Sequence, residues 1–270
     1  MTSPKTQEYL HKPDNLNLVD THCHTEYAYC ARTVTAKDNI AASKTSGLHG
    51  LCLIEHAFQL YFDEDDAWNW KWQTDDALVQ KAWETGRGRM PEYRKFAQGL
   101  RDQHDGYVRL GLEVDLRADG SLLLAEEDMR DWDMLIGSVH YIHDFDKDHT
   151  TPAQAERLFL RETERLLAQP IQVIAHPFRF LYHAKVKCSP LYKTVARWLA
   201  QSGVAAELNF HWNKPDPRFI EMCLSHGVKI ALATDSHDLA EVGELSLHIN
   251  LLRQLGICER DLPDVLYQPD

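Results

Sequence analysis

The sequence lacks any long apolar run. No stretch of its 270 residues approaches the roughly 18 apolar residues that a membrane-spanning helix needs. The segment from Met1 to Asn17 is polar and shows none of the apolar core of a secretory signal peptide. We therefore expect a cytoplasmic protein that does not insert into a membrane.

Positive charge is also scarce. The chain has 29 lysines and arginines against 41 aspartates and glutamates, which gives a formal net charge of −12. Binding of duplex DNA or of an anionic membrane requires a positive face that contacts phosphates. The charge balance therefore argues against both partners. An acidic protein can still bind a phosphate when metal ions supply the positive charge.

Paired cysteine motifs are missing as well. The six cysteines include no C-x-x-C pair. Because no secretory signal is visible, we expect reduced thiols rather than disulfides. Histidine, by contrast, is abundant, and several of the fifteen histidines stand beside acidic residues.

Short apolar runs alternate with amphipathic stretches along the chain. The runs predict seven buried strands at Leu16–Val19, Gly50–Ile54, Tyr107–Leu112, Met134–Val139, Ile171–Ala175, Val204–Leu208 and Lys229–Ala233. The stretches between them predict helices at Ala36–Ser46, Pro91–Gln103, from Pro152 onward, and at Pro190–Gln201, Pro217–Ser225 and Leu239–Leu255. This alternation indicates an α/β fold with a parallel sheet. Seven units in this length close more naturally as a barrel in one domain.

Two segments do not fit the alternation. Residues 1–15 predict a polar N-terminal extension. Residues 58–90 predict a long loop insertion, acidic at first and then rich in tryptophan, with Trp68, Trp70 and Trp72. The tryptophans either cover the pocket and stack on a ring of the substrate, or pack the loop onto the barrel. We favour packing, because aromatic residues usually serve in cores.

Histidines and carboxylates gather at the C-terminal ends of the predicted strands. They are Asp20, His22, His24, Glu55, His56, Glu113, His140, His176, Asp235 and His237. In a (β/α) barrel these strand ends meet on the face where active sites are built. Residues far apart in the sequence would then share one pocket. Each motif alone could consist of structural histidines that are satisfied by hydrogen bonds. Burying so many polar groups beside apolar strands is energetically costly, so the whole set argues against a purely structural role.

The pair His22 and His24 indicates a metal site. In an extended segment, residues i and i+2 point to the same side, so both imidazoles can reach one cation. Asp235 and His237 repeat this spacing with mixed ligands. Imidazole together with carboxylate suits zinc, manganese or iron rather than calcium or magnesium. The set exceeds the four ligands of one zinc ion, so we expect about two to three ions.

These residues resemble the motifs of the polymerase and histidinol phosphatase superfamily, the PHP domain. The strings are Asp20-Thr-His22-Cys-His24, Glu55-His56, Gly111-Leu-Glu113-Val-Asp115, Ser138-Val-His140, His176-Pro177 and Thr234-Asp235-Ser-His237. The third and fourth strings are most similar to the histidinol-phosphatase branch. The resemblance implies a distorted seven-stranded (β/α) barrel, which agrees with the predicted strand count.

The resemblance also implies a trinuclear site and assigns ligands to each ion. The first ion would have His22, His24, Glu113 and Asp235, the second would share Glu113 and add His140 and His176, and the third would have His56 and His237. The family usually adds a histidine to the third ion, at the position where this chain has Cys30.

Cys30 therefore has three possible interpretations. A thiolate binds zinc well, so Cys30 can replace the histidine and shift the metal preference away from manganese. Alternatively, the third site is weakened or absent and the centre is dinuclear. The remaining possibility is a small buried thiol that binds no metal.

Groups that could bind a phosphate follow the same strand ends. The candidates are Arg179, Lys214, Arg32 and Asn209, and His211 follows the same strand as Asn209. Histidinol phosphatases, which this pattern resembles, carry a phosphate-binding arginine in the loop that contains Lys214. Each of the three cations is equally compatible with a solvated surface residue.

Together these features predict a metal-dependent phosphoesterase that acts on a small phosphorylated metabolite. The resemblance makes L-histidinol phosphate the first substrate to test. We expect Asp235 to take a proton from the attacking water, and His237 or another pocket histidine to protonate the leaving group. One alternative is a phosphodiesterase or nuclease, which the acidic charge disfavours. The other is a ligand-binding protein without turnover, which the nearly complete ligand set disfavours.

Overall fold

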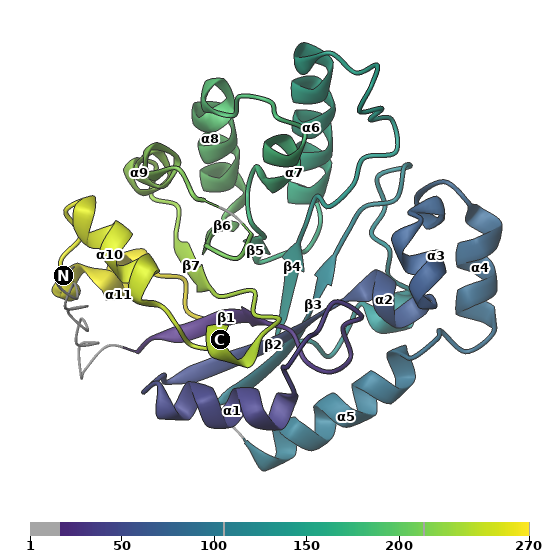
Figure 1. The fold of residues 1–270 in the computed structure, drawn as a ribbon, viewed down its shortest axis with the longest axis horizontal. Helices are drawn as coiled ribbons and strands as arrows, with labels where there is room; N and C mark the ends of the chain where they lie inside the picture. The colour runs from purple at the N-terminus through teal and green to yellow at the C-terminus, as the bar shows by residue number, and fades with distance from the viewer. Residues whose placement is uncertain (1–16, 105, 213, 270) are drawn as a thin grey trace, which may run out of the picture.

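Seven parallel strands lie side by side in the order of the sequence, with helices around them (Figure 1). A computed structural model describes residues 17–104, 106–212 and 214–269, so the predicted extension at residues 1–15 lies outside the described residues. The strands are β1 Val19–Cys23, β2 Gly50–His56, β3 Val108–Val114, β4 Met134–Gly137, β5 Val173–Ile174, β6 Ala205–Asn209 and β7 Ile230–Ala233. The predicted seven-stranded α/β barrel is confirmed.

The barrel closes where the end of β7 meets the end of β1. The backbone N–H of Asp235 donates to the carbonyl of His22 at 2.7 Å, and a bridge joins Cys23 to Ser236. Below this seam the buried carboxylate of Asp20 accepts hydrogen bonds from the backbone and the hydroxyl of Thr234, at 2.9 and 2.7 Å. The closure places the two short motifs from opposite ends of the chain side by side.

Alternate residues of the strands form layers inside the barrel. One buried cluster fills the interior with Val19, Cys52, Ile54, Met134, Ile136, Val173, Ala175, Ala205 and Ala231. Residues two positions apart on a strand share a face. The strands that contribute Ile54 and Ala205 to this cluster therefore contribute His56 and Glu207 to the next layer, toward the C-terminal ends.

The strand boundaries differ from the predicted ones at this polar layer. The first strand was predicted to end at Val19, whereas β1 begins there and includes Asp20 and His22. Likewise His56 lies in β2 and Glu113 in β3. A search for apolar runs ends a strand at its first polar residue. Here the strands continue through polar residues, because those side chains find partners across the barrel.

The outer helices are close to their predicted positions. They are α1 Ala36–Thr45, α5 Met90–Gln103, α6 Pro152–Leu167, α8 Tyr192–Ser202, α9 Pro217–Ser225 and α10 Ser246–Gln254. Two short helices were not predicted, α7 Arg179–His183 and α11 Leu262–Val265. Side chains of Thr35, Thr151 and Asp216 cap α1, α6 and α9 by accepting from backbone N–H groups of the first turn. Within the part of the chain that the structure describes, no helix is long and apolar enough to cross a bilayer.

The predicted helix Leu239–Leu255 is interrupted. A short 3₁₀ turn spans Leu239–Glu241, and α10 begins only at Ser246. Gly243 between them has a φ of +70°, which a continuous right-handed helix does not allow. The break keeps Glu241 beside the strand ends, where its carboxylate accepts from the backbone N–H of His237 at 3.0 Å.

The predicted loop at residues 58–90 is largely helical. It contains α2 Ala57–Tyr61, α3 Glu64–Trp68, a 3₁₀ turn Lys71–Gln73 and α4 Asp76–Glu84. The acidic run starts a helix, because Asp63 caps α3 and the next three acidic residues form its first turn. Asp75 caps α4 in the same way. Helices of five residues are too short to show a helical period, so the sequence pattern misses them.

A matched pair of glycines tests the strand packing. A Cβ on Gly111 in β3 would lie 2.1 Å from the carbonyl oxygen of Met134, whereas one on Gly99 in α5 meets nothing within 4 Å. We expect Gly111→Ala to lower the free energy of unfolding by about 1–3 kcal/mol. Gly99→Ala should raise it by about 0.5–1 kcal/mol, as expected in a helix. Urea denaturation measures both, and equal values would contradict this packing.

Candidate metal centre

The carboxylate of Glu113 lies at the centre of the polar layer. It is fully buried, and β2 pairs with β3 so that His56 stands directly opposite it. Its Oε2 lies 2.8 Å from Nδ1 of His56, 3.5 Å from Nε2 of His22 and 3.8 Å from Nε2 of His24. One oxygen therefore faces three imidazoles from two other strand ends.

The second oxygen of Glu113 faces another pair of histidines. Its Oε1 lies 2.9 Å from Nε2 of His176 and 3.3 Å from Nε2 of His140. The hydroxyl of Ser138 lies 3.3 Å from the same nitrogen of each ring. Glu113 thus has different imidazoles on its two oxygens, which is the arrangement a bridging carboxylate needs.

Asp235 occupies the seam between β7 and β1. Its Oδ1 lies 3.1 Å from Nε2 of His24, and its Oδ2 accepts from Arg179 at 2.7 Å and from Asn209 at 3.1 Å. Its φ of +51° is uncommon for a residue with a side chain, and such strain concentrates at functional sites. The seam therefore holds Asp235 in one orientation.

Further carboxylates orient the imidazoles from behind. Nδ1 of His22 lies 3.1 Å from Glu207, and Nδ1 of His140 lies 3.0 Å from Asp115. Hydrogen bonds of this kind select the ring tautomer and are typical of metal-binding histidines. Sequence reasoning did not assign Glu207 a role. The available signal was an acidic residue inside a strand that is otherwise apolar.

Several buried atoms in this layer make no hydrogen bond of acceptable geometry with the described residues, even though two of them, His56 Nδ1 and Glu113 Oε2, lie 2.8 Å apart. They are His22 Nε2, His24 Nδ1, His56 Nδ1, Glu55 Oε2 and Glu113 Oε2. Unpaired polar atoms are costly to bury. Ligand atoms approach within 4.8 Å of one another in three overlapping groups: His22, His24 and Glu113; His56, Glu113 and His140; and His24, His56 and His237. The donor set therefore fits divalent transition-metal ions.

The charges around the centre favour a cation. Burial lowers the pKa of His22, but Glu207, Glu113 and Asp235 outweigh it and raise that pKa well above its usual value. Burial likewise opposes the increase at His24, whose contacts with Asp235 and Glu55 raise its pKa to about 9. Without a metal ion, the carboxylates therefore draw protons onto these two rings.

Cys30 and His237 lie together at one side of the centre. Nε2 of His237 is 3.1 Å from the sulfur of Cys30, and its Nδ1 is 2.8 Å from the carbonyl of Asp235. The amide of Gln59 lies 3.6 Å from the same sulfur. Burial, followed by the nearby charge of His24, lowers the pKa of His237 to about 3. Cys30 thus contacts one predicted ligand, although none of the three groups includes it.

The tryptophan-rich segment supports the ligand histidines. The ring of Trp70 stacks on His140 with centroids 6.2 Å apart, and Phe58 lies 5.2 Å from His56. Trp72 is completely buried, whereas Trp68 is 40% exposed and reaches the pocket. Trp70 and Trp72 therefore pack as the favoured interpretation predicts, while Trp68 both packs on Phe58 and lines the cavity.

A cavity of about 330 Å³ opens onto the centre. Its lining consists of Cys30, Arg32, His56, Trp68, His140, Arg179, His183, His211, Trp212, Asp235 and His237. Arg179 and Arg32, two of the predicted phosphate ligands, therefore line this cavity. Arg32 also forms an ion pair with Asp238 at 2.6 Å. Asn209 is buried behind Arg179, to which it accepts a hydrogen bond at 3.2 Å. Lys214 is exposed and is not part of the lining.

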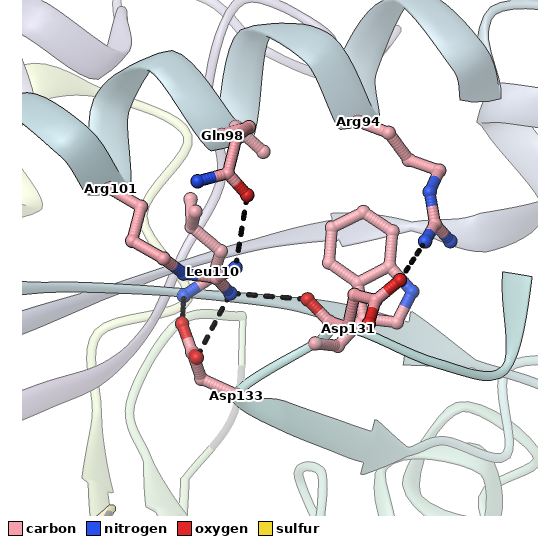
Figure 2. Close-up of a pocket in the computed structure, with 8 residues that line it drawn as sticks. Arg94, Gln98, Arg101, Leu110, Asp131 and Asp133 are labelled. Atoms are coloured by element: carbon pink, nitrogen blue, oxygen red, sulfur yellow. Dashed lines mark hydrogen bonds and ion pairs between the residues drawn. The ribbon is translucent and has the colours of Figure 1, made fainter.

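A second cavity of about 310 Å³ lies between α5 and the segment that leads into β4. Figure 2 shows that its arginines face aspartates. Arg94 pairs with Asp131 and Arg101 pairs with Asp133, both at 2.9 Å. Asp133 precedes β4, so this cavity lies toward the N-terminal ends of the strands. Its charges are paired and its lining contains no imidazole, in contrast to the cavity at the other end of the barrel.

The chain is similar to known proteins in sequence and in fold. The family model for the PHP domain matches residues 20–211. A curated relative, a probable histidinol-phosphatase of Deinococcus radiodurans, is 27% identical over 252 residues, which cover 84% of this chain and 88% of the relative.

Two solved structures are similar in fold. The histidinol phosphate phosphatase HisK of Lactococcus lactis, in complex with zinc, L-histidinol and phosphate, has a TM-score of 0.63 and 19% identity over 90% of this chain and 95% of that one. The putative histidinol phosphatase HisK of Listeria monocytogenes has a TM-score of 0.61 and 14% identity over 86% of this chain and 100% of that one. At these identities, the similarity concerns the fold.

Glu113→Gln tests the shared ligand. The substitution keeps the shape of the side chain but removes the charge that lets both oxygens hold a cation. We expect zinc-loaded wild type to hold about two to three ions per chain and the variant to lose more than one of them. Metal analysis of both proteins after dialysis measures this. Glu164→Gln, at an exposed position of α6, should retain every ion. Loss of one ion or none from Glu113→Gln would contradict a bridging role.

Proposed function

This chain belongs to the PHP domain family, and on that premise we propose that it is a metal-dependent phosphomonoesterase that hydrolyses a small phosphorylated metabolite. The observation that carries the proposal is the layer of imidazoles around Glu113, open to a cavity of about 330 Å³. A cavity of this size suits a small metabolite. The curated relative and the zinc, L-histidinol and phosphate complex support L-histidinol phosphate as the first substrate to test.

The ligand sets that we propose are those that the resemblance implies, and each shares at least two residues with one of the three metal-compatible groups. His22, His24, Glu113 and Asp235 would hold one ion, Glu113, His140 and His176 a second, and His56, His237 and Cys30 a third. Zinc is the favoured metal because thiolate and imidazole both suit it, and manganese and iron are the alternatives. When bound, such ions polarise phosphoryl oxygens and supply a hydroxide nucleophile near neutral pH.

The chain's own residues position the phosphate and the water. Arg179 lines the cavity and is held by Asn209 and Asp235, so its guanidinium is preorganised to bind phosphate oxygens. Arg32 is a second phosphate ligand at the opening of the cavity. Asp235, fixed by Arg179 and the seam, takes the proton from the attacking water. The role of Lys214 stays a prediction.

His237 is predicted both to bind a metal ion and to protonate the leaving group, and one ring nitrogen cannot do both. A ring nitrogen that holds a metal ion has no proton to donate. Its Nε2 faces Cys30 and the group with His24 and His56, and its Nδ1 faces the backbone of Asp235. We therefore propose His237 as a metal ligand, which leaves the leaving-group proton to another residue.

A panel of phosphate esters tests the reaction class. With zinc or manganese present, we expect phosphate release from L-histidinol phosphate or other small monoesters and no cleavage of duplex DNA. Asp235→Asn should lower kcat by at least about 100-fold, because the water loses its proton acceptor. Its unfolding midpoint should stay near that of wild type. Asp131→Asn, in the second cavity, should keep full activity.

Two results would overturn this assignment. No phosphate release from any ester with any metal would favour a ligand-binding protein. Faster hydrolysis of bis(4-nitrophenyl) phosphate than of 4-nitrophenyl phosphate would favour a phosphodiesterase.

Cobalt substitution tests Cys30. If the sulfur ligates the third ion, the Co(II) protein should show a thiolate-to-metal charge-transfer band, because a thiolate is then bound directly. Cys30→Ser should lose this band and one zinc ion, and Cys30→His should recover the ion without the band. Cys258→Ser, at an exposed cysteine, is the control and should behave as wild type. An unchanged band and unchanged zinc content in Cys30→Ser would show that Cys30 only packs.

A further inference from the structure

One imidazole of the pocket has no place in the proposed ligand set. His211 follows β6 and lines the cavity, and its side chain is only 5% exposed. Its ring stacks on that of His237, with centroids 4.5 Å apart and planes 15° apart. None of the three metal-compatible groups includes it. His211 therefore lies beside the centre and is available for another task.

His211 is held in place by a carboxylate. Its Nδ1 lies 3.1 Å from Oε1 of Glu241, and its backbone N–H donates to Asn209 at 2.8 Å. Glu241 is itself fixed, since its Oε2 accepts from the backbone N–H groups of His237 and Asp238 at 3.0 and 3.1 Å. Glu241 thus binds the Nδ1 edge of the ring. Nε2 has no hydrogen-bond partner among the described residues, so it is the nitrogen left for the cavity.

We propose that His211 is the general acid of the reaction and that Glu241 is its positioning residue. This inference rests on the proposed phosphomonoesterase function. The oxygen of the attacking water forms a bond to phosphorus, and the bond between phosphorus and the leaving oxygen breaks. The proton on Nε2 of His211 passes to the leaving oxygen, which departs as an alcohol. Asp235 takes the proton of the water, and exchange with solvent then restores both residues.

The geometry favours His211 over the other histidines of the cavity lining. Both ring nitrogens of His237 face other groups, and His56 and His140 belong to the groups around Glu113. His183 also lines the cavity, but no carboxylate among the described residues lies within hydrogen-bonding distance of its ring. A proton donor needs a fixed ring and a free nitrogen, and His211 combines them.

The test compares two esters that differ in leaving group. Hydrolysis of 4-nitrobenzyl phosphate expels an alkoxide that needs a proton, whereas 4-nitrophenyl phosphate expels a phenolate that is stable without one. His211→Gln keeps an amide donor near Nε2 but cannot transfer a proton. We expect it to lower kcat for the benzyl ester by about 10²- to 10⁴-fold and to change that for the phenyl ester only a few-fold.

Three measurements accompany this comparison. The zinc content of His211→Gln should equal that of wild type, which separates proton transfer from metal loss. Glu241→Gln should lower kcat for the benzyl ester alone, by a smaller factor and without raising KM, because it loosens the ring but leaves it present. His149→Gln removes a matched pair at the surface, where His149 lies 2.8 Å from Asp146, and should change neither ester.

The outcomes separate the inference from the proposed function. Equal losses on both esters would show that His211 serves binding or structure, and no loss on either would show that it has no role. Each result overturns the inference while leaving the phosphatase assignment intact. If wild type releases phosphate from neither ester with any metal, the assignment itself fails and the inference fails with it.

Discussion

The contact between the ends of β7 and β1 is the interaction on which the site depends. The backbone hydrogen bond from Asp235 to His22, at 2.7 Å, joins two motifs from opposite ends of the chain. Asp20 secures the same seam from below by binding Thr234. Without this closure, Asp235 would not face His24, and the polar layer would be open on one side.

A second constraint is the mutual dependence of the buried charges. A carboxylate as deeply buried as Glu113 is tolerated only with positive charge or hydrogen-bond donors around it. Burial raises the pKa of Glu113, but the histidines around it, first His140 and then His56, lower that pKa well below its usual value. Carboxylates such as Glu207 in turn orient the rings. The centre is therefore preorganised by its protein contacts, as sites on rigid strands usually are.

The strands and the loops contribute different residues to the site. Strand ends supply most of the proposed ligands, such as His22, His56 and Glu113. The pairing register of neighbouring strands determines their relative positions. Loops and short helices supply Cys30, Trp68 and His211, which line the cavity. Binding and specificity often reside in loops on a rigid scaffold.

The sequence by itself determined the architecture and most of the polar layer. Alternating apolar runs predicted seven parallel strands, and the spacing of motifs such as His22 and His24 indicated a metal site, because both signals are local and periodic. Local patterns could not place the end of β1, the short helices at residues 57–84 or the break at Gly243. Those features depend on partners distant in the chain. Only the tertiary structure decided that Glu207 supports His22 and that Glu241 holds His211, since each pair forms when segments separated in sequence pack together.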